Sequence, residues 1–226
     1  MATAQIDPTG QLEIAGLHST EPEPLPFGGG GLSIRAFLLE RAAGNLLIYS
    51  TTGLANDGAP LRDRGPLVRH YLNHHHEAMF LPEELAAIDA PLVVGEDDRA
   101  AVADRAAVPV HAFSKRHHAD PDFEVIPTPG HTPGATAYLW DTGTHRLLFT
   151  GDSLYLRDGE WVAAVLSSSD RRSYLRSLEL IAGLDFDVLV PWAAGADSPP
   201  LAFVDAGEAR ERVAAITRRI RSGGDH

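Results

Sequence analysis

Four residues of metal-binding types stand at three places in the sequence. His74 and His76 belong to the run NHHHEAMF (73–80), His131 lies in PTPGHTPG (127–134), and Asp152 lies in FTGDSLY (149–155). Imidazole nitrogens and carboxylate oxygens are common protein ligands of zinc and of other first-row divalent metals. Taken singly, each has a simpler interpretation: the histidine run as a solvated loop, His131 as a turn residue and Asp152 as a cap. Their surroundings therefore decide between the two interpretations.

A short buried strand is expected at residues 68–72 (VRHYL), directly before the histidine run. In an extended segment, residues two apart point to the same side. We therefore expect His74 and His76 to face one metal together, while His75 points elsewhere. The same alternation places Glu77 on the side opposite to these two histidines.

Three expected strands place the other two candidates. Residues 123–126 (FEVI), 135–140 (ATAYLW) and 146–149 (RLLF) are apolar and β-branched runs bounded by glycine and proline. A DTGT turn suits a hairpin between the last two. His131 and Asp152, each next to a glycine, would then project from tight turns at strand ends, which is a suitable place for metal ligands.

The motifs PGHTPG and TGD, in this order and at this spacing, resemble the third and fourth motifs of the metallo-β-lactamase superfamily. The resemblance extends from about residue 32 to residue 191. It implies a four-layer αββα sandwich of the α/β (α+β) class, in which His74, His76, His131 and Asp152 bind metal. In that family the aspartate bridges two metals where two are present.

The sequence departs from the superfamily pattern at the second metal site. The family motif Thr-His-x-His-x-Asp-His aligns its Asp with Ala78 and its last His with Met79, and a later Pro-Gly-His-Gly aligns its His with Ala193. None of these side chains suits a zinc ion, since methionine offers only a soft thioether. The three histidines of the first site are intact, so the resemblance implies a mononuclear centre. Thr51 also replaces the Asp of an Asp-Thr-Gly motif, which is a mild departure.

The surviving ligands imply a metal-dependent hydrolase. We expect one divalent metal, with Zn²⁺ first and Fe or Mn as alternatives, held by three neutral imidazoles that leave a position for water. Zinc lowers the pKa of such a water to roughly 7. Asp152 would either bind the same metal or act as the catalytic orienter and general base. The expected substrate is a small-molecule ester, lactone, thioester or amide.

Two other functions stay open. The replacements at Ala78, Met79 and Ala193 also suit a non-catalytic binding or regulatory protein with a degenerate metal site. Three histidines and a carboxylate also suit an iron-dependent oxygenase. Four further residues are candidate replacement ligands: Glu77, His117, His118 and Asp197.

Composition narrows the function classes. The 226 residues contain no cysteine and carry a formal net charge of −12, which suits a reducing compartment and argues against binding of nucleic-acid phosphates. No signal peptide or membrane-spanning apolar run is visible, so a cytoplasmic protein that binds neither membrane nor nucleic acid is expected. Residues 1–226 are expected to form a single domain with loose tails at 1–10 and 222–226, and a homodimer is a common assembly for such a domain.

The remaining segments complete the expected sandwich. Strands are expected at 11–19, 92–94, 108–112, 160–165 and 186–190, with a hairpin of 32–40 and 45–50. Helices are expected at 59–67, 82–89, 97–106, 171–182 and 204–220, and a polar loop at 115–120. The last two helices carry apolar residues at helical spacing, as helices packed on a core do.

Overall fold

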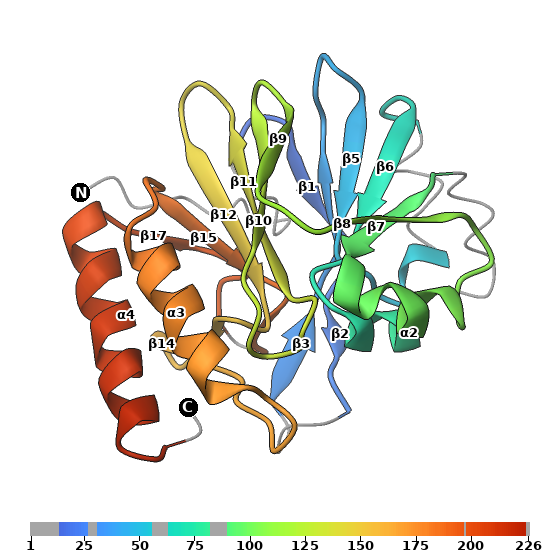
Figure 1. The fold of residues 1–226 in the computed structure, drawn as a ribbon. Coiled ribbons are helices and arrows are strands. Elements are labelled where there is room, and N and C mark those ends of the chain that lie inside the picture. The colour runs from blue at the N-terminus through green and yellow to red at the C-terminus, as the bar shows by residue number, and fades with distance from the viewer. Residues whose placement is uncertain (1–13, 27–30, 56–62, 82–89, 197, 225–226) are drawn as a thin grey trace.

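Two six-stranded sheets lie face to face in the computed structural model, which describes residues 14–26, 31–55, 63–81, 90–196 and 198–224. Figure 1 shows helices on the outer side of each sheet, so the layers run αββα. This arrangement confirms the expected four-layer sandwich of mixed α and β structure. Among the described helices, none is long and apolar enough to cross a membrane.

The first sheet has the strand order β1-β4-β5-β6-β7-β8. Its strands are β1 Leu17–Ser19, β4 Phe37–Leu39, β5 Asn45–Ile48, β6 Leu67–Tyr71, β7 Leu92–Gly95 and β8 Val110–Phe113. Strands β5 to β8 are parallel, so their carboxyl ends meet at one edge. Three short helical segments lie at that edge: η1 His75–Phe80, η3 Glu96–Asp98 and α2 Arg99–Ala103.

The second sheet has the strand order β17-β15-β12-β11-β10-β9. Its strands are β9 His117–Asp120, β10 Phe123–Pro127, β11 Thr136–Asp141, β12 Arg146–Gly151, β15 Val188–Pro191 and β17 Ala202–Phe203. A smaller sheet of β2 Glu23–Pro24, β3 Leu32–Ile34, β13 Tyr155–Arg157, β14 Glu160–Val162 and β16 Ala193–Gly195 joins the two halves below. Its members come from both halves of the chain.

Aromatic side chains fill the space between the two large sheets. Tyr71 of the first sheet packs on Phe123 and Tyr138 of the second, with ring centroids 5.0 Å apart in both pairs. Phe37 and Phe149 meet edge to face across the same interface, with centroids 6.0 Å apart. Offset and edge-to-face contacts of this kind are favourable beyond the area that they bury. This core holds the two sheets in a fixed relation.

Two long helices cover the outer face of the second sheet (Figure 1). Helix α3 spans Arg171–Ala182, as the sequence predicts, and helix α4 spans Ala206–Arg221 rather than 204–220. Asp205 caps α4 by accepting the N–H groups of Gly207 and Glu208, which sets its start. The apolar faces of both helices are buried in one cluster with the sheet.

The prediction of a single strand at 32–40, as the first arm of a hairpin with 45–50, is wrong in one respect. The segment forms two strands that belong to different sheets. Strand β3 pairs with β16 in the small sheet, while β4 pairs with β1 and β5 in the first. The chain bends at Arg35 and Ala36, whose N–H groups donate to Trp192 O and to the Thr20 hydroxyl. These bonds satisfy the backbone at the bend, so the strand need not continue.

The polar loop expected at 115–120 is also wrong. Residues His117–Asp120 form the edge strand β9, which pairs with β10. Polar side chains suit an exposed edge strand, and so the composition of this segment does not distinguish an edge strand from a loop.

Several other expected bounds shift, and two expected elements cannot be compared in full. The strands at 11–19, 92–94, 108–112, 160–165 and 186–190 correspond to β1, β7, β8, β14 and β15, and the helix at 97–106 corresponds to η3 and α2. The helix expected at 82–89 lies outside the described residues. So do residues 59–62 of the helix expected at 59–67, but its other residues, 63–67, are described and form a turn and the start of strand β6, so the helix prediction is wrong there. Boundaries are the least reliable part of such predictions, because end residues fray and pair locally.

Arg41 ties the first sheet to the edge of the second. Its side chain is 1% exposed and donates to both carboxylates of a nearby turn, from Nε to Asp122 Oδ2 at 2.9 Å and from Nη2 to Asp120 Oδ2 at 2.9 Å. The hydrogen bond from Arg41 lowers the pKa of Asp122. A buried guanidinium needs such partners, since an unpaired charge is costly away from water.

We predict that Asp122→Asn lowers the free energy of unfolding by about 1–2 kcal/mol at pH 7, since Arg41 keeps only Asp120 as a charged partner. Because the folded pKa of Asp122 lies below its unfolded value of about 3.9, its contribution is present above that value and is lost as the pH falls through the folded pKa. The difference between wild type and variant in urea unfolding should therefore shrink below pH 4.

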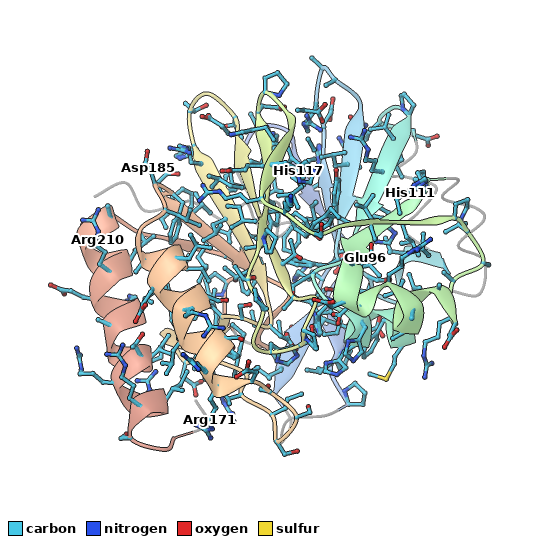
Figure 2. All side chains as sticks on the ribbon, in the orientation of Figure 1. Glu96, His111, His117, Arg171, Asp185 and Arg210 are labelled. Carbon is cyan, nitrogen blue, oxygen red and sulfur yellow. The ribbon has the colours of Figure 1, made fainter. Side chains whose placement is uncertain are left out.

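Asp185→Asn is the matched control. Asp185 also pairs with an arginine, Arg146, but its side chain is 81% exposed and lies at the surface (Figure 2). Its loss should change the free energy of unfolding by less than about 0.5 kcal/mol. Equal effects of the two substitutions would contradict the role given to Arg41.

Candidate metal centre

The histidine run follows β6 and turns at once into a helical segment. His74 is extended, with φ −159° and ψ 169°, and the 3-10 helix η1 begins at His75. The expected alternation of an extended segment is therefore wrong from His75 onward. His74 and His76 still point into one space, because the turn of η1 brings the His76 ring back beside His74, with ring centroids 5.0 Å apart.

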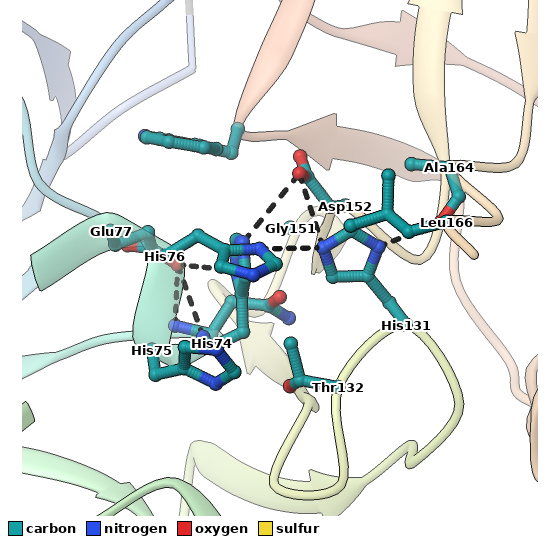
Figure 3. Close-up of polar contacts among 12 residues, drawn as sticks. His74, His75, His76, Glu77, His131, Thr132, Gly151, Asp152, Ala164 and Leu166 are labelled. Carbon is teal, nitrogen blue, oxygen red and sulfur yellow. Dashed lines mark hydrogen bonds and ion pairs between the residues drawn. The ribbon is translucent and has the colours of Figure 1, made fainter. Parts of the chain in front are cut away.

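The four candidate ligands from the three motifs lie close together (Figure 3). His76 Nδ1 lies 3.2 Å from His131 Nε2. Asp152 Oδ2 lies 3.5 Å from both His74 Nε2 and His131 Nε2. The ligand atoms of the three histidines all lie within 4.8 Å of one another. The fold thus brings together residues that are up to 78 positions apart in the numbering, from 74 to 152.

His131 is held by the backbone around it. Its Nδ1 lies 2.7 Å from the Ala164 carbonyl, which fixes a proton on Nδ1 and leaves the lone pair of Nε2 directed at the other ligands. Gly130, with φ 147°, precedes it, and a Cβ there would lie 2.4 Å from the Tyr174 Cα of helix α3. Glycine is therefore required where the PGHTPG turn packs against that helix.

Asn73 joins the two sheets directly below the cluster. Its Nδ2 donates to the Thr136 carbonyl and, at 3.2 Å, to the Thr150 carbonyl. Its backbone carbonyl accepts the Thr136 N–H at 2.9 Å. Asn73 thus connects the end of β6, which carries His74, to the start of β11 and the end of β12, which carries Asp152.

Glu77 lies behind the His74 ring. Its carboxylate is fully buried, and Oε1 lies 3.2 Å from His74 Nδ1. It also accepts the N–H groups of Asn73 at 2.7 Å and of Ser50 at 3.1 Å. The expectation that Glu77 points away from His74 is wrong, because η1 is helical. Glu77 contacts the nitrogen of His74 that faces away from the cluster, so it orients this ring rather than replacing a lost ligand.

Burial sets the protonation of the cluster. It lowers the pKa of His74 well below the ordinary value, with His131 and His76 adding to the effect, and it lowers the pKa of His76 to about 4. Burial raises the pKa of Asp152, and His131 opposes that rise. Neutral imidazole is the form that binds metals, so His74 and His76 hold their ligand form at neutral pH.

The donor set fits a divalent cation. His74 Nε2 is buried and has no hydrogen-bond partner, yet buried polar atoms are nearly always paired. It points at His76 Nδ1, at His131 Nε2 and at a carboxylate oxygen, which are three further acceptor atoms. Three imidazoles and a carboxylate directed at one point suit zinc or iron. Within the described part of the chain, the three histidines are the one group of His, Cys, Asp or Glu side chains whose ligand atoms all come this close together.

The residues that align with the second metal site of the superfamily motif do not form a second group of metal ligands. Ala78 is buried in the core on the outer side of the first sheet, while Met79 and Ala193 line the cleft beside the cluster. Two candidate replacements, His117 and His118, lie on the edge strand β9, where Figure 2 shows His117, and they have exposed side chains. The fourth candidate, Asp197, lies outside the described residues.

Asp98 supports the loops of the site, whereas the sequence predicts it only as a residue at the start of a helix. It is buried, and its carboxylate accepts the Thr132 hydroxyl at 2.6 Å and the Gly134 N–H at 3.1 Å. It also accepts the His75 N–H at 3.0 Å. Asp98 thus ties the loop of His131 to the loop of His76. The doublet Asp97-Asp98 gives no sequence signal that separates this role from helix capping.

The sandwich and its histidine cluster define a protein of a known class. The family model described as the metallo-beta-lactamase superfamily matches residues 59–193. The chain therefore belongs to the metallo-beta-lactamase superfamily, and the resemblance in the motifs is confirmed. A comparison with curated proteins finds no match.

Solved structures of the superfamily share the fold. A metallo-beta-lactamase from Pontibacter korlensis is 14% identical with a TM-score of 0.68, over 89% of this chain and 99% of that one. An archaeal metallo-beta-lactamase superfamily protein from Sulfolobus tokodaii is 20% identical with a TM-score of 0.65, over 88% and 85%. A family protein from Thermus thermophilus is 18% identical with a TM-score of 0.63, over 92% and 80%. At these identities the likeness shows the fold alone.

We predict that Gly151→Ala disrupts the site. Gly151 has φ 54°, and a Cβ there would lie 1.9 Å from Asn73 Cγ, so the link between the two sheets must move. We expect a loss of about 3 kcal/mol in the free energy of unfolding and at least a tenfold loss of zinc affinity, measured by competition with a chromogenic chelator.

Gly143→Ala is the control, since Gly143 also has positive φ, 83°, but no atom lies within 4 Å of its Cβ position. It should cost only the backbone strain, about 1 kcal/mol, and should leave zinc affinity unchanged. Wild-type zinc affinity in Gly151→Ala would show that Asn73 does not position the ligands.

Proposed function

We propose that the protein is a metal-dependent hydrolase with one metal per chain, held by His74, His76, His131 and Asp152. One observation carries the proposal: these four side chains meet at the end of a cleft, with a buried imidazole nitrogen that has no other partner. When bound, a Zn²⁺ ion supplies Lewis acidity for a carbonyl group and for water. A small-molecule ester, lactone, thioester or amide is the proposed substrate class.

Other residues of the chain orient the candidate ligands, and Asp152 is placed to handle the proton of the attacking water. Ala164 and Glu77 hold the rings of His131 and His74, so that both present Nε2 to the same point. Asp152 is 17% exposed at its side chain and lines the cleft, so its Oδ2 is placed to hold water and to take a proton from it. Trp192 packs edge to face on the His74 ring and lines the cleft beside the cluster.

Two observations favour other functions, and the hydrolysis test below has a separate result that would support each of them. The replacement of second-site ligands at Ala78, Met79 and Ala193 suits a binding or regulatory protein without turnover. The donor set of three imidazoles and one carboxylate suits iron as well as zinc, which would support an oxygenase. The proposed partners are small molecules only, since the net charge of −12 disfavours nucleic acid, and a homodimer is proposed as the assembly.

We predict that the zinc-loaded protein hydrolyses a generic ester, lactone or thioester, and that His131→Ala lowers kcat/KM at least a hundredfold by removing a ligand. His118→Ala is the matched control, because this histidine is exposed on strand β9, and it should stay within twofold of wild type. Turnover would be measured by release of 4-nitrophenol from the ester, of a free thiol from the thioester and of acid from the lactone.

Three results would contradict the proposal. The absence of turnover in the zinc-loaded protein for all three substrate types would support the binding function. Activity that needs iron and consumes oxygen would support the oxygenase. Equal rates in wild type and His131→Ala would show that the cluster is not the site of hydrolysis.

A further inference from the structure

The cleft beside the cluster has apolar walls. Its volume is about 480 Å³, and apart from His76, His131, Asp152 and Tyr155 its described lining consists of aliphatic and aromatic side chains with one methionine. No lysine or arginine lines it among the described residues. A cleft of this size can enclose a small molecule. The chemistry of its lining therefore indicates which kind of molecule it accepts.

Two of the exposed apolar residues of the protein stand at this cleft. Large apolar side chains that are markedly exposed number four in the described chain: Val68, Met79, Leu166 and Phe203. Met79, at 45% exposure, and Leu166, at 42%, both line the cleft, and they come from segments 87 residues apart, from 79 to 166. Exposed apolar groups gathered at a cleft mark a binding surface, whereas scattered ones need no explanation.

The wall that carries Leu166 is fixed beside His131. The Leu166 N–H donates to the Ser169 hydroxyl at 2.9 Å, and that hydroxyl donates to the His131 carbonyl at 3.0 Å. The Ala164 N–H donates to the Tyr174 hydroxyl at 3.0 Å. The polar backbone groups of this loop are thus used in holding it, and Figure 3 shows the Leu166 side chain beside His131.

The opposite wall is fixed as well. Trp192 packs edge to face on the His74 ring, with centroids 5.5 Å apart, and Phe80 packs on Trp192 at 5.3 Å. The indole N–H of Trp192 donates to the Ser50 carbonyl at 2.9 Å, so it offers the cleft no polar atom. Met79 and Ala193, which stand at second-site positions of the superfamily motif, complete this apolar wall.

We propose that the substrate is a neutral carbonyl compound with an apolar acyl group, which packs between the Met79–Trp192 wall and Leu166. This proposal rests on the proposed hydrolase for the reaction itself. A carboxylate on the acyl group would enter an apolar space next to Asp152, where the described lining offers no lysine or arginine, which is costly for a charge. The protein therefore selects against acidic acyl groups.

The first test compares esters that differ in one feature. Initial rates of the zinc-loaded protein would be measured for 4-nitrophenyl acetate, 4-nitrophenyl hexanoate and the 4-nitrophenyl monoester of adipic acid, which is the hexanoate with a terminal carboxylate in place of the methyl group. A fully buried methylene contributes about fourfold, so we expect kcat/KM to rise at least tenfold from acetate to hexanoate. We expect the adipate monoester to fall at least tenfold below the hexanoate.

Two variants locate this preference in the cleft. Met79→Lys and Leu166→Lys each place a cation on one wall, so each should lower the hexanoate-to-adipate ratio at least fivefold. Val68→Lys is the matched control, since Val68 is an exposed apolar residue outside the cleft lining, and its ratio should stay within twofold of wild type. A wild-type ratio near one, or an unchanged ratio in both cleft variants, would overturn the proposal.

A binding measurement separates this proposal from the proposed hydrolase. N-phenyl-1-naphthylamine is neutral, and 8-anilinonaphthalene-1-sulfonate has the same rings with an added sulfonate. From fluorescence titrations we expect the neutral probe to bind wild type at least tenfold more tightly, and this preference to shrink at least fivefold in Met79→Lys but not in Val68→Lys. If no ester is hydrolysed but these shifts in affinity occur, the proposed hydrolase is wrong and the proposed apolar site is supported. If esters are hydrolysed but the shifts in affinity do not occur, only the proposed apolar site is wrong.

Discussion

The hydrogen bonds of Asn73 are the constraint on which the candidate site depends. This side chain lies between the two sheets and bonds to the carbonyls of Thr136 and Thr150. His74 follows it directly in the chain, and Asp152 follows the Thr150–Gly151 end of β12. A movement of one sheet relative to the other would therefore separate the histidine loop from the aspartate. The aromatic core between the sheets resists such a movement, because its rings interlock across the interface.

A second set of contacts fixes the ligands individually. The two most buried histidines of the cluster each have the outer ring nitrogen next to an acceptor, which is Glu77 for His74 and the Ala164 carbonyl for His131. Asp98 joins the loops that carry His76 and His131. The candidate ligands thus keep their geometry through the protein alone, and this preorganisation is what a metal site needs for affinity. The positions of Met79 and Ala193 then give the cleft an apolar wall instead of further ligands.

The sequence predicts those parts of the fold and of the candidate site that depend on local residue type. Glycines and prolines mark the turns at His131 and Asp152, and the apolar periodicity marks helix α3 with its correct bounds. The superfamily resemblance, now confirmed, supplies the sandwich, and it points to the four candidate ligands, which the fold brings together. The prediction fails where long-range pairing decides, as in strand β9, whose polar residues read as a loop. It fails again at η1, because a helical turn after His74 moves the Glu77 carboxylate behind the ring. The roles of Asn73 and Asp98 depend on partners more than 20 residues away, so no local pattern indicates them.

The proposed centre holds one metal per chain, at His74, His76, His131 and Asp152. Metal content by plasma mass spectrometry, on protein loaded with zinc and then freed of excess metal, tests it most directly. The account predicts about one equivalent per chain. Two equivalents would contradict it, because a second site would then exist despite Ala78, Met79 and Ala193. The absence of bound zinc would contradict it as well, because the buried imidazoles would then need another explanation.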